Sequence, residues 1–556
     1  MGGNTVLTLR PKLITTGVGL FLLNYFSRRI KMKRFMNVVL LIMVGIIGIF
    51  SFPMSTFAEE NTLRVGLEAA YPPFNWTQQT GQNGAVPIEG SNEFANGYDV
   101  QMAKKIAEGL GKRLVLVKIE WDGLVPALTS GRIDLIMAGM SPTAERAKQI
   151  DFSDAYYESD LVMVVNAKGK YANASKLDDF TGAGIVAQLN TFHDTVIDQI
   201  PGVNHLEPMS DFSIMRVAVQ TGKADGYVAE RPEAMAAETA GVGIKMVDLN
   251  PGFDTDKADT SIAIGIKKGN PIRERLNQIL SDVSKEDRLE LMDEMNILQN
   301  KEENEGEGLE RFLNNMKTIF IENKSNFIRG TGYTVLISFV GTVLGLVLGL
   351  IVGIIRTIPE SLKKGKNFVL NIFKVLANIY VQVLRGTPMI VQSVLVYFGL
   401  LQFAGINLSP MQAAFLVVSV NTGAYLSEVV RGGINSIDKG QFEAARSLGM
   451  NHYQTMVHVV LPQAIKNIIP AIGNEFIVNI KDTSVLNVIA VNELFFTTKS
   501  IVGGNLMYFE TYLITSIIYL TLTLSIAYFL HFVERLLADP NSYVKTGNTD
   551  VMKSAN

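Results

Sequence analysis

The chain has 556 residues, of which 47% are hydrophobic and 19% are charged, and its formal net charge is −3. This charge excludes the basic surface typical of nucleic-acid-binding proteins. The absence of cysteine excludes disulfide frameworks, zinc–thiolate sites and iron–sulfur clusters, and five scattered histidines favour no metal site. Because the chain is too apolar for a purely soluble protein and too charged for a purely membrane one, we expect a soluble part joined to a membrane part.

The N-terminal extension, residues 1–58, carries a basic stretch followed by the apolar segment Val38–Phe52. A basic region, an apolar region and small residues ending at Ala58 are typical of a secretory signal peptide. An uncleaved membrane anchor fits the same pattern, and Met32 and Met36 are both plausible starting residues. Under either interpretation, the chain that follows is exported.

Residues 59–300 alternate short aliphatic runs with helical patterns. The runs form two sets, one of Leu63–Leu67, Tyr98–Leu110, Leu114–Ile119, Trp121–Gly131 and Ile133–Ala138, and one of Leu161–Val165, Gly184–Gln188, Phe212–Thr221 and Ala224–Ala229. This alternation predicts βαβ units, mostly parallel sheets and two α/β lobes with a ligand cleft between them. Asp160–Val165 and Thr260–Ile266 are candidates for strands that cross between the lobes.

A charged run at residues 301–307 marks the start of a linker, which we place at 301–330. The membrane part follows at 331–540. Its first uncharged segment, Tyr333–Ile355, is long enough to cross a hydrocarbon core of about 30 Å. Glycines recur at every fourth position of this segment, which predicts close packing of one helix face against another helix. These glycines are Gly341, Gly345, Gly349 and Gly353.

Four further spans bring the expected number of transmembrane helices to five. They are Met389–Phe403, Ala413–Tyr425, Ile469–Ile489 and Thr511–Phe532. Basic residues cluster after the first span, after the third span and in the tail at 541–556, whereas the other loops carry none or only Lys499. The cluster after the first span comprises Arg356, Lys363, Lys364, Lys366, Lys374 and Arg385. The positive-inside rule therefore places the tail in the cytoplasm and the exported domain outside the cell membrane.

The segment between the third and fourth spans, residues 436–466, contains a spaced motif. It reads Glu443, Ala444, Ala445, three residues, Gly449, nine residues, and then Val459, Val460, Leu461 and Pro462. This motif resembles the EAA loop of bacterial ABC-importer permeases, with Val459 where isoleucine is usual. Surrounding motifs narrow the resemblance to permeases for polar amino acids over residues 326–540. They are Arg385–Pro388, Glu428–Gly433, Gly473–Phe476 and Lys481–Ser484.

From the residues, we expect two short helices in this loop, broken at Gly449, with Pro462 ending the second. The resemblance implies that Glu443, Ala444, Ala445 and Gly449 couple the permease to a cytoplasmic ATPase. It also implies a homodimer of permease domains within membrane lipid. No G-x-x-x-x-G-K-[ST] motif occurs in the chain, so we expect no cofactor here and ATP use by a separate subunit.

Residues 61–300 resemble the amino acid-binding family of solute-binding proteins, which implies the two-lobed periplasmic-binding-protein fold. The matching stretches are Gly66–Phe74, Gly97–Val100, Trp121–Leu128, Ile133–Asp134, Gly139–Arg146 and Asp151–Asp154. A bound α-amino acid needs a cation for its carboxylate, which Arg146 supplies, with further donors from Gly139 and Ser141. Glu230 falls where the family places the acid that binds the ammonium group, although many relatives have aspartate there.

The remaining candidate residues concern the ligand side chain. In the family, aromatic residues at Tyr71 and Trp121 enclose it, and Thr191 and Phe192 lie on the loop of the opposite lobe. Glu68 falls where many relatives carry an acid that contacts the side chain. Beside aromatic faces it would favour lysine, arginine or histidine, but glutamine binders carry an acid at this position too.

The sequence therefore indicates a fused receptor and permease of an ATP-driven amino acid importer rather than an enzyme. A ligand-gated channel is the alternative, since the same binding fold can sit on a pore domain, but no filter-like loop is evident between the spans. An enzyme of this fold would need an acid or base facing the cleft, a role open to Glu68 or Glu230.

Overall fold

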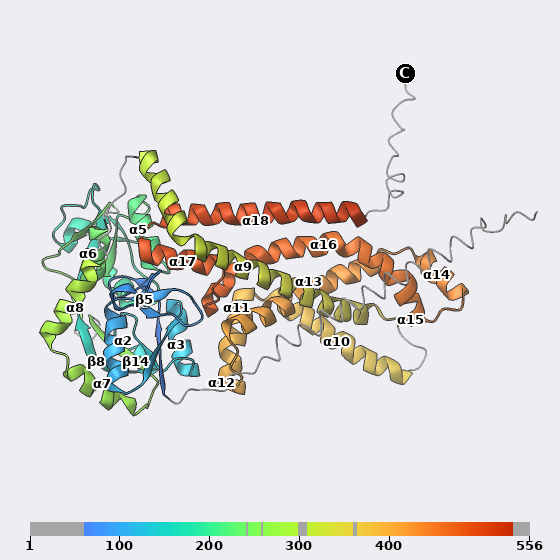
Figure 1. Ribbon diagram of the computed structural model, residues 1–556, viewed down its shortest axis with the longest axis horizontal. Coiled ribbons are helices and arrows are strands. Elements are labelled where there is room, and N and C mark those ends of the chain that lie inside the picture. The colour runs from blue at the N-terminus through green and yellow to red at the C-terminus, as the bar shows by residue number, and fades with distance from the viewer. Residues whose placement is uncertain (1–60, 241–242, 257–259, 299–307, 360–363, 538–556) are drawn as a thin grey trace, which may run out of the picture. The chain divides into compact units, whose positions relative to one another are not determined.

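The computed structural model describes residues 61–537 apart from 241–242, 257–259, 299–307 and 360–363. The predicted signal peptide or anchor and the cytoplasmic tail lie outside the described residues. The described chain folds into an α/β part with two lobes and a helical part with five helices long and apolar enough to cross a membrane (Figure 1).

The first lobe is built on a five-stranded sheet whose central strands are buried along most of their length. The sheet order is β6-β1-β7-β14-β8. Its strands are β1 (Thr62–Leu67), β6 (Arg113–Lys118), β7 (Leu135–Ile136), β8 (Asp151–Glu158) and β14 (Ser261–Ile266). Leu63, Val65 and Leu67 of β1 are fully buried, because helices cover the sheet. The helices of this lobe are α2 (Tyr98–Gly109), α3 (Trp121–Ser130), α7 (Ile272–Ser281) and α8 (Lys285–Ile297).

The second lobe repeats this architecture with the order β11-β10-β12-β9-β13. Its strands are β9 (Leu161–Asn166), β10 (Gly184–Val186), β11 (Asn204–His205), β12 (Gly226–Glu230) and β13 (Ile244–Val247). Its helices are α4 (Phe192–Val196), α5 (Phe212–Gln220) and α6 (Arg231–Thr239). A small antiparallel sheet beside the first lobe contains β2 (Ala70–Tyr71), β3 (Asn75–Gln78), β4 (Val86–Pro87) and β5 (Phe94–Asn96). The two-lobed fold is therefore confirmed.

Two details of the sheets differ from expectation. Each five-stranded sheet has two parallel and two antiparallel pairings, so the sheets are mixed rather than mostly parallel. The strands β9 and β14 each belong wholly to one lobe, and the outgoing chain crosses between lobes at residues 159–160. Strands that enter a sheet after a crossing arrive from the opposite end, which is why they pair antiparallel.

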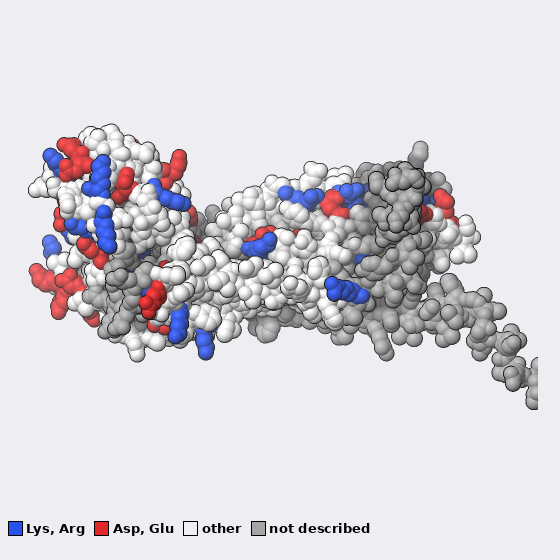
Figure 2. Space-filling model, turned by 90° about the horizontal axis from the view of Figure 1, so that it is seen from above, with Lys and Arg blue, Asp and Glu red and all other residues white. Residues whose placement is uncertain are grey.

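The helical part begins with a helix of 50 residues, α9 (Gly308–Thr357), so residues 308–330 continue directly into the first span. The other helices that cross the bundle are α10 (Lys364–Gly386), α13 (Pro410–Asn435), α16 (Leu461–Asp482) and α18 (Tyr508–Leu537). The shorter elements are α11 (Met389–Val394), η5 (Leu395–Gly399), α12 (Leu400–Ala404), α14 (Lys439–Ser447), α15 (His452–Thr455), η6 (Met456–Val460), η7 (Thr483–Ile489) and α17 (Leu494–Asn505). On the face shown in Figure 2, charged side chains crowd the α/β part and are sparse over the helices, as a membrane-embedded surface requires.

The number of span-length helices matches the prediction, but the second span was misplaced. The helix that meets this criterion is Asn367–Gly386, whereas Met389–Ala404 is a shorter apolar helix. Two cations, Lys374 and Arg385, hid the span in the sequence, and both lie within it rather than in a loop. The guanidinium of Arg385 is partly neutralised, because it lies 3.9 Å from the Glu428 carboxylate and faces the Tyr425 ring.

The glycine repeat packs as predicted against α13. A Cβ added at any of the four glycines would meet a side chain of that helix. The pairs, which we call the glycine seam, are Gly341 with Val418, Gly345 with Thr422, Gly349 with Leu426 and Gly353 with Val430. Both helices repeat at four-residue spacing, so the absence of side chains on α9 lets the two backbones approach closely.

Candidate functional site

A pocket lies between the two lobes, and six residues from each lobe line it. They are Glu68, Tyr71, Trp121, Gly139, Ser141 and Arg146 from the first lobe, and Gln188, Thr191, Phe192, His193, Phe212 and Glu230 from the second. All nine candidate residues of the sequence are thus brought together. The side chains leave space for about one water molecule, so the lobes are closed on each other.

Glu230 ends β12 and is 3% exposed at the second lobe's wall of the pocket. Its carboxylate accepts a hydrogen bond from the Tyr71 hydroxyl of the first lobe and lies 3.0 Å from the His193 Nε2 atom. Burial alone would raise the pKa of Glu230, but the adjacent His193 imidazole and the hydrogen bond from the Tyr71 hydroxyl outweigh it and lower the pKa. Glu230 therefore stays ionised and can bind an ammonium group.

Arg146 begins a short 3₁₀ turn at the edge of the first lobe, and its guanidinium already connects the lobes. Nη1 donates to the Ser141 carbonyl at 3.0 Å, and Nη2 donates to the Asn190 carbonyl of the second lobe at 3.0 Å. The guanidinium also lies 5.1 Å from the centre of the Trp121 ring. A ligand carboxylate would bind this planar fork in place of the neutral carbonyls, with the advantage of opposite charge.

Glu68 follows β1 and is 9% exposed in the pocket. Burial is the largest cause that raises its pKa to about 8, and the nearby Glu120 carboxylate adds to the rise. The ammonium groups of Lys499 and Lys118 act in the opposite direction. A cationic group brought into the pocket would favour the ionised form of this acid and lower its pKa.

Aromatic rings form the apolar walls of the pocket. The Tyr71 ring stacks on Phe74 of its own lobe and on Phe212 of the second lobe, with centroids 5.2 Å and 4.9 Å apart. Gly139 has a φ of 64°, and a Cβ there would lie 2.7 Å from the Tyr71 ring, so only glycine fits beside it. The Tyr71 and Phe212 rings thus stack on each other across the cleft, and a planar side chain such as a guanidinium or an amide would bind between aromatic faces only after these rings separate.

Three pocket residues were missed from the sequence: Gln188, His193 and Phe212. Gln188 and His193 flank the Thr191–Phe192 pair, so a longer reading of that loop would have included them. Phe212 had no such signal, because a phenylalanine that begins an amphipathic helix is ordinarily a core residue.

The loop between the third and fourth spans, residues 436–466, differs in one respect from its predicted form. The helix α14 ends before Gly449, which has a φ of 77° and provides the expected break. Pro462 does not end the second helix, which runs on into α16. The preceding turn, Met456–Val460, is a π-helix, and its wider winding accommodates the missing proline N–H group.

The surface of this loop combines small and large exposed residues. Glu443, Ala444 and Gly449 are exposed, whereas Ala445 is 2% exposed and packs inward. Leu448 and Tyr453 flank the break and are 79% and 72% exposed. Exposed large apolar side chains at a bend are typical of a protein interaction site.

The α/β part and the helical part of the chain each match a known protein family. Residues 63–296 match the family of bacterial extracellular solute-binding proteins, family 3. Residues 345–539 match the family described as binding-protein-dependent transport system inner membrane component.

Individual relatives cover the permease and the binding domain separately. The glutamine transport system permease protein GlnP of Escherichia coli (strain K12) is 38% identical over 29% of this chain and 73% of its own length. The arginine transport system permease protein ArtQ of Bacillus subtilis (strain 168) is 40% identical over 29% of this chain and 74% of its own length. A crystal structure of the substrate-binding protein of an amino acid ABC transporter is 29% identical over 42% of this chain and 98% of that one, with a TM-score of 0.35.

Permeases of this family are not catalytic and use ATP through a separate ATPase subunit. The chain belongs to the family of binding-protein-dependent transport system inner membrane components and carries a family 3 solute-binding domain in front of its permease, as the fused binding protein and permease of an ABC importer for polar amino acids.

Proposed function

We propose that the pocket between the lobes binds an L-α-amino acid with a cationic side chain, arginine before lysine or histidine. Arg146, with Gly139 and Ser141 beside it, would hold the ligand carboxylate, and Glu230 would hold its ammonium group. The observation that carries this proposal is the convergence of the buried, ionised Glu230 and the Arg146 fork on one pocket from opposite lobes.

The cationic preference rests on Glu68 and on the walls around it. Glu68 is a buried acid in the same pocket as Tyr71 and Trp121, with Thr191 and Phe192 on the opposite wall. A guanidinium between aromatic faces and a carboxylate gains both cation–π and ionic stabilisation. One of the similar permeases is named for arginine transport and another for glutamine transport, so glutamine is the competing substrate.

The same proposal assigns the chain an orientation in the cell membrane. The binding domain would be extracellular, and α14 would face the cytoplasm, because α14 and α17 lie at opposite ends of the helix bundle (Figure 1). Two copies of the permease domain would form one pathway within membrane lipid. Glu443, Ala444, Ala445 and Gly449 would contact the ATPase, with the exposed Leu448 and Tyr453 beside them.

Calorimetry on the full chain in lipid nanodiscs at pH 8 tests the substrate assignment. L-Arginine is expected to bind with a Kd in the micromolar range or below, and Glu68→Gln should weaken this binding at least tenfold, about 1.4 kcal/mol, while L-glutamine changes little. Glu238→Gln, at an exposed carboxylate of the second lobe, is the matched control.

Each other outcome has a definite meaning. Tight binding of glutamine alone would refute the cationic preference and leave the importer intact. If a folded chain binds neither amino acid, the site built on Arg146 and Glu230 is wrong. Ligand-stimulated ATP hydrolysis with a partner ATPase supports coupling through the cytoplasmic loop, whereas ligand-evoked current without ATP would favour a channel.

A further inference from the structure

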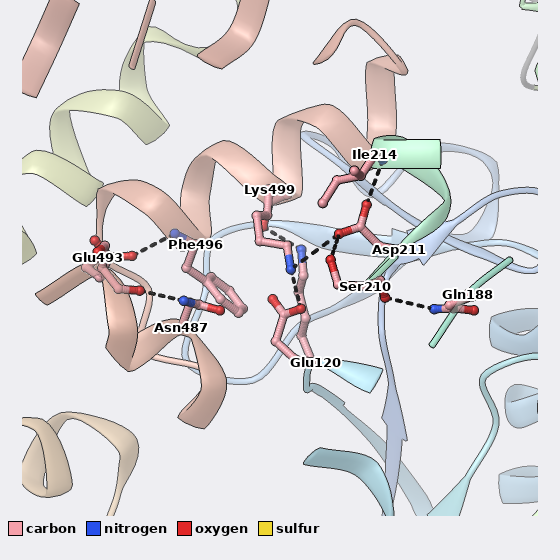
Figure 3. A network of polar contacts seen from close by, with 12 residues as sticks. Glu120, Gln188, Ser210, Asp211, Ile214, Asn487, Glu493, Phe496 and Lys499 are labelled. Atoms are coloured by element: carbon pink, nitrogen blue, oxygen red, sulfur yellow. Dashed lines mark hydrogen bonds and ion pairs between the residues drawn. The ribbon is translucent and has the colours of Figure 1, made fainter. Parts of the chain in front are cut away.

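The helix α17 belongs to the permease but lies against the binding domain. Its start is firmly held, because the Glu493 carboxylate accepts a hydrogen bond from the backbone N–H group of Phe496 at 2.7 Å (Figure 3). It also accepts hydrogen bonds from the backbone N–H group of Phe495 at 3.0 Å and from the Tyr519 hydroxyl of α18 at 3.1 Å. A helix fixed at its first turn presents the side chains farther along it in defined positions. One of these is Lys499.

The Lys499 ammonium group contacts both lobes at once. Its Nζ atom lies 2.5 Å from Glu120 Oε2 of the first lobe and 4.0 Å from Asp211 Oδ2 of the second (Figure 3). The three side chains are only 20%, 17% and 14% exposed, so water screens their charges weakly. The surrounding carboxylates raise the pKa of Lys499 despite its burial, which keeps its charge.

The two acids are joined directly to the walls of the ligand pocket. Glu120 precedes Trp121 at the start of α3, and Asp211 precedes Phe212 at the start of α5. Trp121 and Phe212 line the pocket from opposite lobes. Any motion that separates these two walls therefore also separates the two carboxylates that share Lys499.

Several other polar contacts of the permease reach the first lobe. The Lys118 ammonium group donates to the Ser500 hydroxyl of α17 at 2.5 Å. The Arg132 guanidinium donates to Asn407 Oδ1 and the Leu408 carbonyl at 3.1 Å and 3.0 Å. The second lobe meets the helices through α5, which lies against α18, and through Asp211. The first lobe is thus anchored, and Lys499 joins it to the second.

We propose that Lys499 is a positioning residue that couples closure of the binding lobes to the permease. Its ammonium group binds Glu120 and Asp211 together only when the lobes are closed, so it stabilises the closed domain on α17. The proposal rests on the assignment of the ligand pocket to the cleft between the lobes. It adds to that function a permease residue, Lys499, that contacts both lobes only when the cleft is closed.

Pulsed electron paramagnetic resonance can test this coupling in the absence of ligand. The chain has no cysteine, so spin labels attach only at cysteines introduced for the experiment. Spin labels at Lys105→Cys on the first lobe and Lys176→Cys on the second, both exposed, report the distance between lobes in the full chain in nanodiscs. Lys499→Met should lower the ratio of closed to open molecules roughly fivefold. Lys499→Arg should keep that ratio, and Ser500→Ala, which removes a contact to the first lobe alone, should leave it unchanged.

A second variant tests the contact to the second lobe without disturbing the contact between α17 and the first lobe. Asp211→Asn removes the charge on the second lobe, retains a good cap for α5 and leaves the Glu120 pair in place. It should lower the closed population as Lys499→Met does, and the double variant should show no further loss. An unchanged distance distribution in Lys499→Met, or fully additive losses, would overturn the proposal.

Ligand addition separates this proposal from the proposed function. L-Arginine and L-glutamine are added in turn to the parent and to Lys499→Met. If neither closes the lobes, the proposed pocket fails, while the comparison without ligand still decides the role of Lys499. If arginine closes both proteins but needs a roughly fivefold higher concentration in Lys499→Met, both proposals are supported.

Discussion

The ligand pocket and the glycine seam are both tightly packed, yet they use opposite kinds of residue. The pocket is lined by the charged residues Glu68, Glu230 and Arg146, whereas the seam joins uncharged side chains of α13 to bare backbone on α9. Beside the seam, Asn479 bridges Thr342 and Thr422 at 2.9 Å and 3.1 Å, so even its polar contacts are neutral. Binding in the pocket should therefore depend on charge, and stability at the seam should depend on shape.

Removal of the guanidinium should have the largest effect in the pocket. Arg146→Ala is expected to weaken binding of either L-arginine or L-glutamine by more than about 100-fold, roughly 3 kcal/mol, because two charge-assisted hydrogen bonds to the carboxylate are lost. Calorimetry on the full chain measures the Kd. Arg273→Ala, at an exposed arginine of the same lobe, should bind as the parent does. Parent-like affinity in Arg146→Ala would move the carboxylate site elsewhere.

At the seam, a substitution that changes the shape of a residue but not its charge should lower the stability of the protein. In Gly349→Leu the new Cβ would lie 2.9 Å from the Leu426 Cβ and 3.0 Å from the Ser427 backbone nitrogen. Overpacking of this kind is expected to cost about 1–3 kcal/mol and to lower the thermal stability of the purified chain in detergent. Gly332→Leu on the same helix is the control, because a Cβ there meets nothing within 4 Å. Equal losses for both variants would show that the seam has no special role.

The same contrast explains which features could be predicted from the sequence. Arg146 and Glu230 were predicted from the resemblance to the amino acid-binding family, and the structure brings both to one pocket. The glycine repeat was equally informative, since four glycines on one face have few uses other than close packing. The second span could not be predicted, because Lys374 and Arg385 concealed an apolar helix, and the Glu428 carboxylate that lies near Arg385 is distant in the sequence.

Contacts between the binding domain and the permease could not be predicted from the sequence. Lys499 entered the sequence argument only as one charge in a loop, and nothing nearby in the chain indicates that it contacts Glu120 and Asp211. The prediction that Pro462 ends the second helix of the loop was wrong because of local geometry. The preceding π-turn changes the local winding, and a rule for proline in a regular α-helix does not describe it.

The last prediction concerns pH and separates charge from shape within the pocket itself. Because the pKa of Glu68 is raised to about 8, its carboxyl group is mostly neutral below that pH when the pocket holds no cation. A cationic side chain binds the carboxylate and must release this proton, so arginine binding should tighten as the pH rises towards 8. The limiting slope is about tenfold in Kd per pH unit.

Calorimetry from pH 6 to pH 8.5 should therefore give a ratio of glutamine to arginine Kd values that rises with pH. Each ligand has the same α-ammonium and α-carboxylate groups, so their titration cancels in this ratio. In Glu68→Gln the ratio should be flat, because no proton is released at that position. A flat ratio in the parent would show that Glu68 contacts the ligand as a neutral hydrogen-bonding group, and the selectivity of the pocket would then follow from its shape, as packing does at the seam.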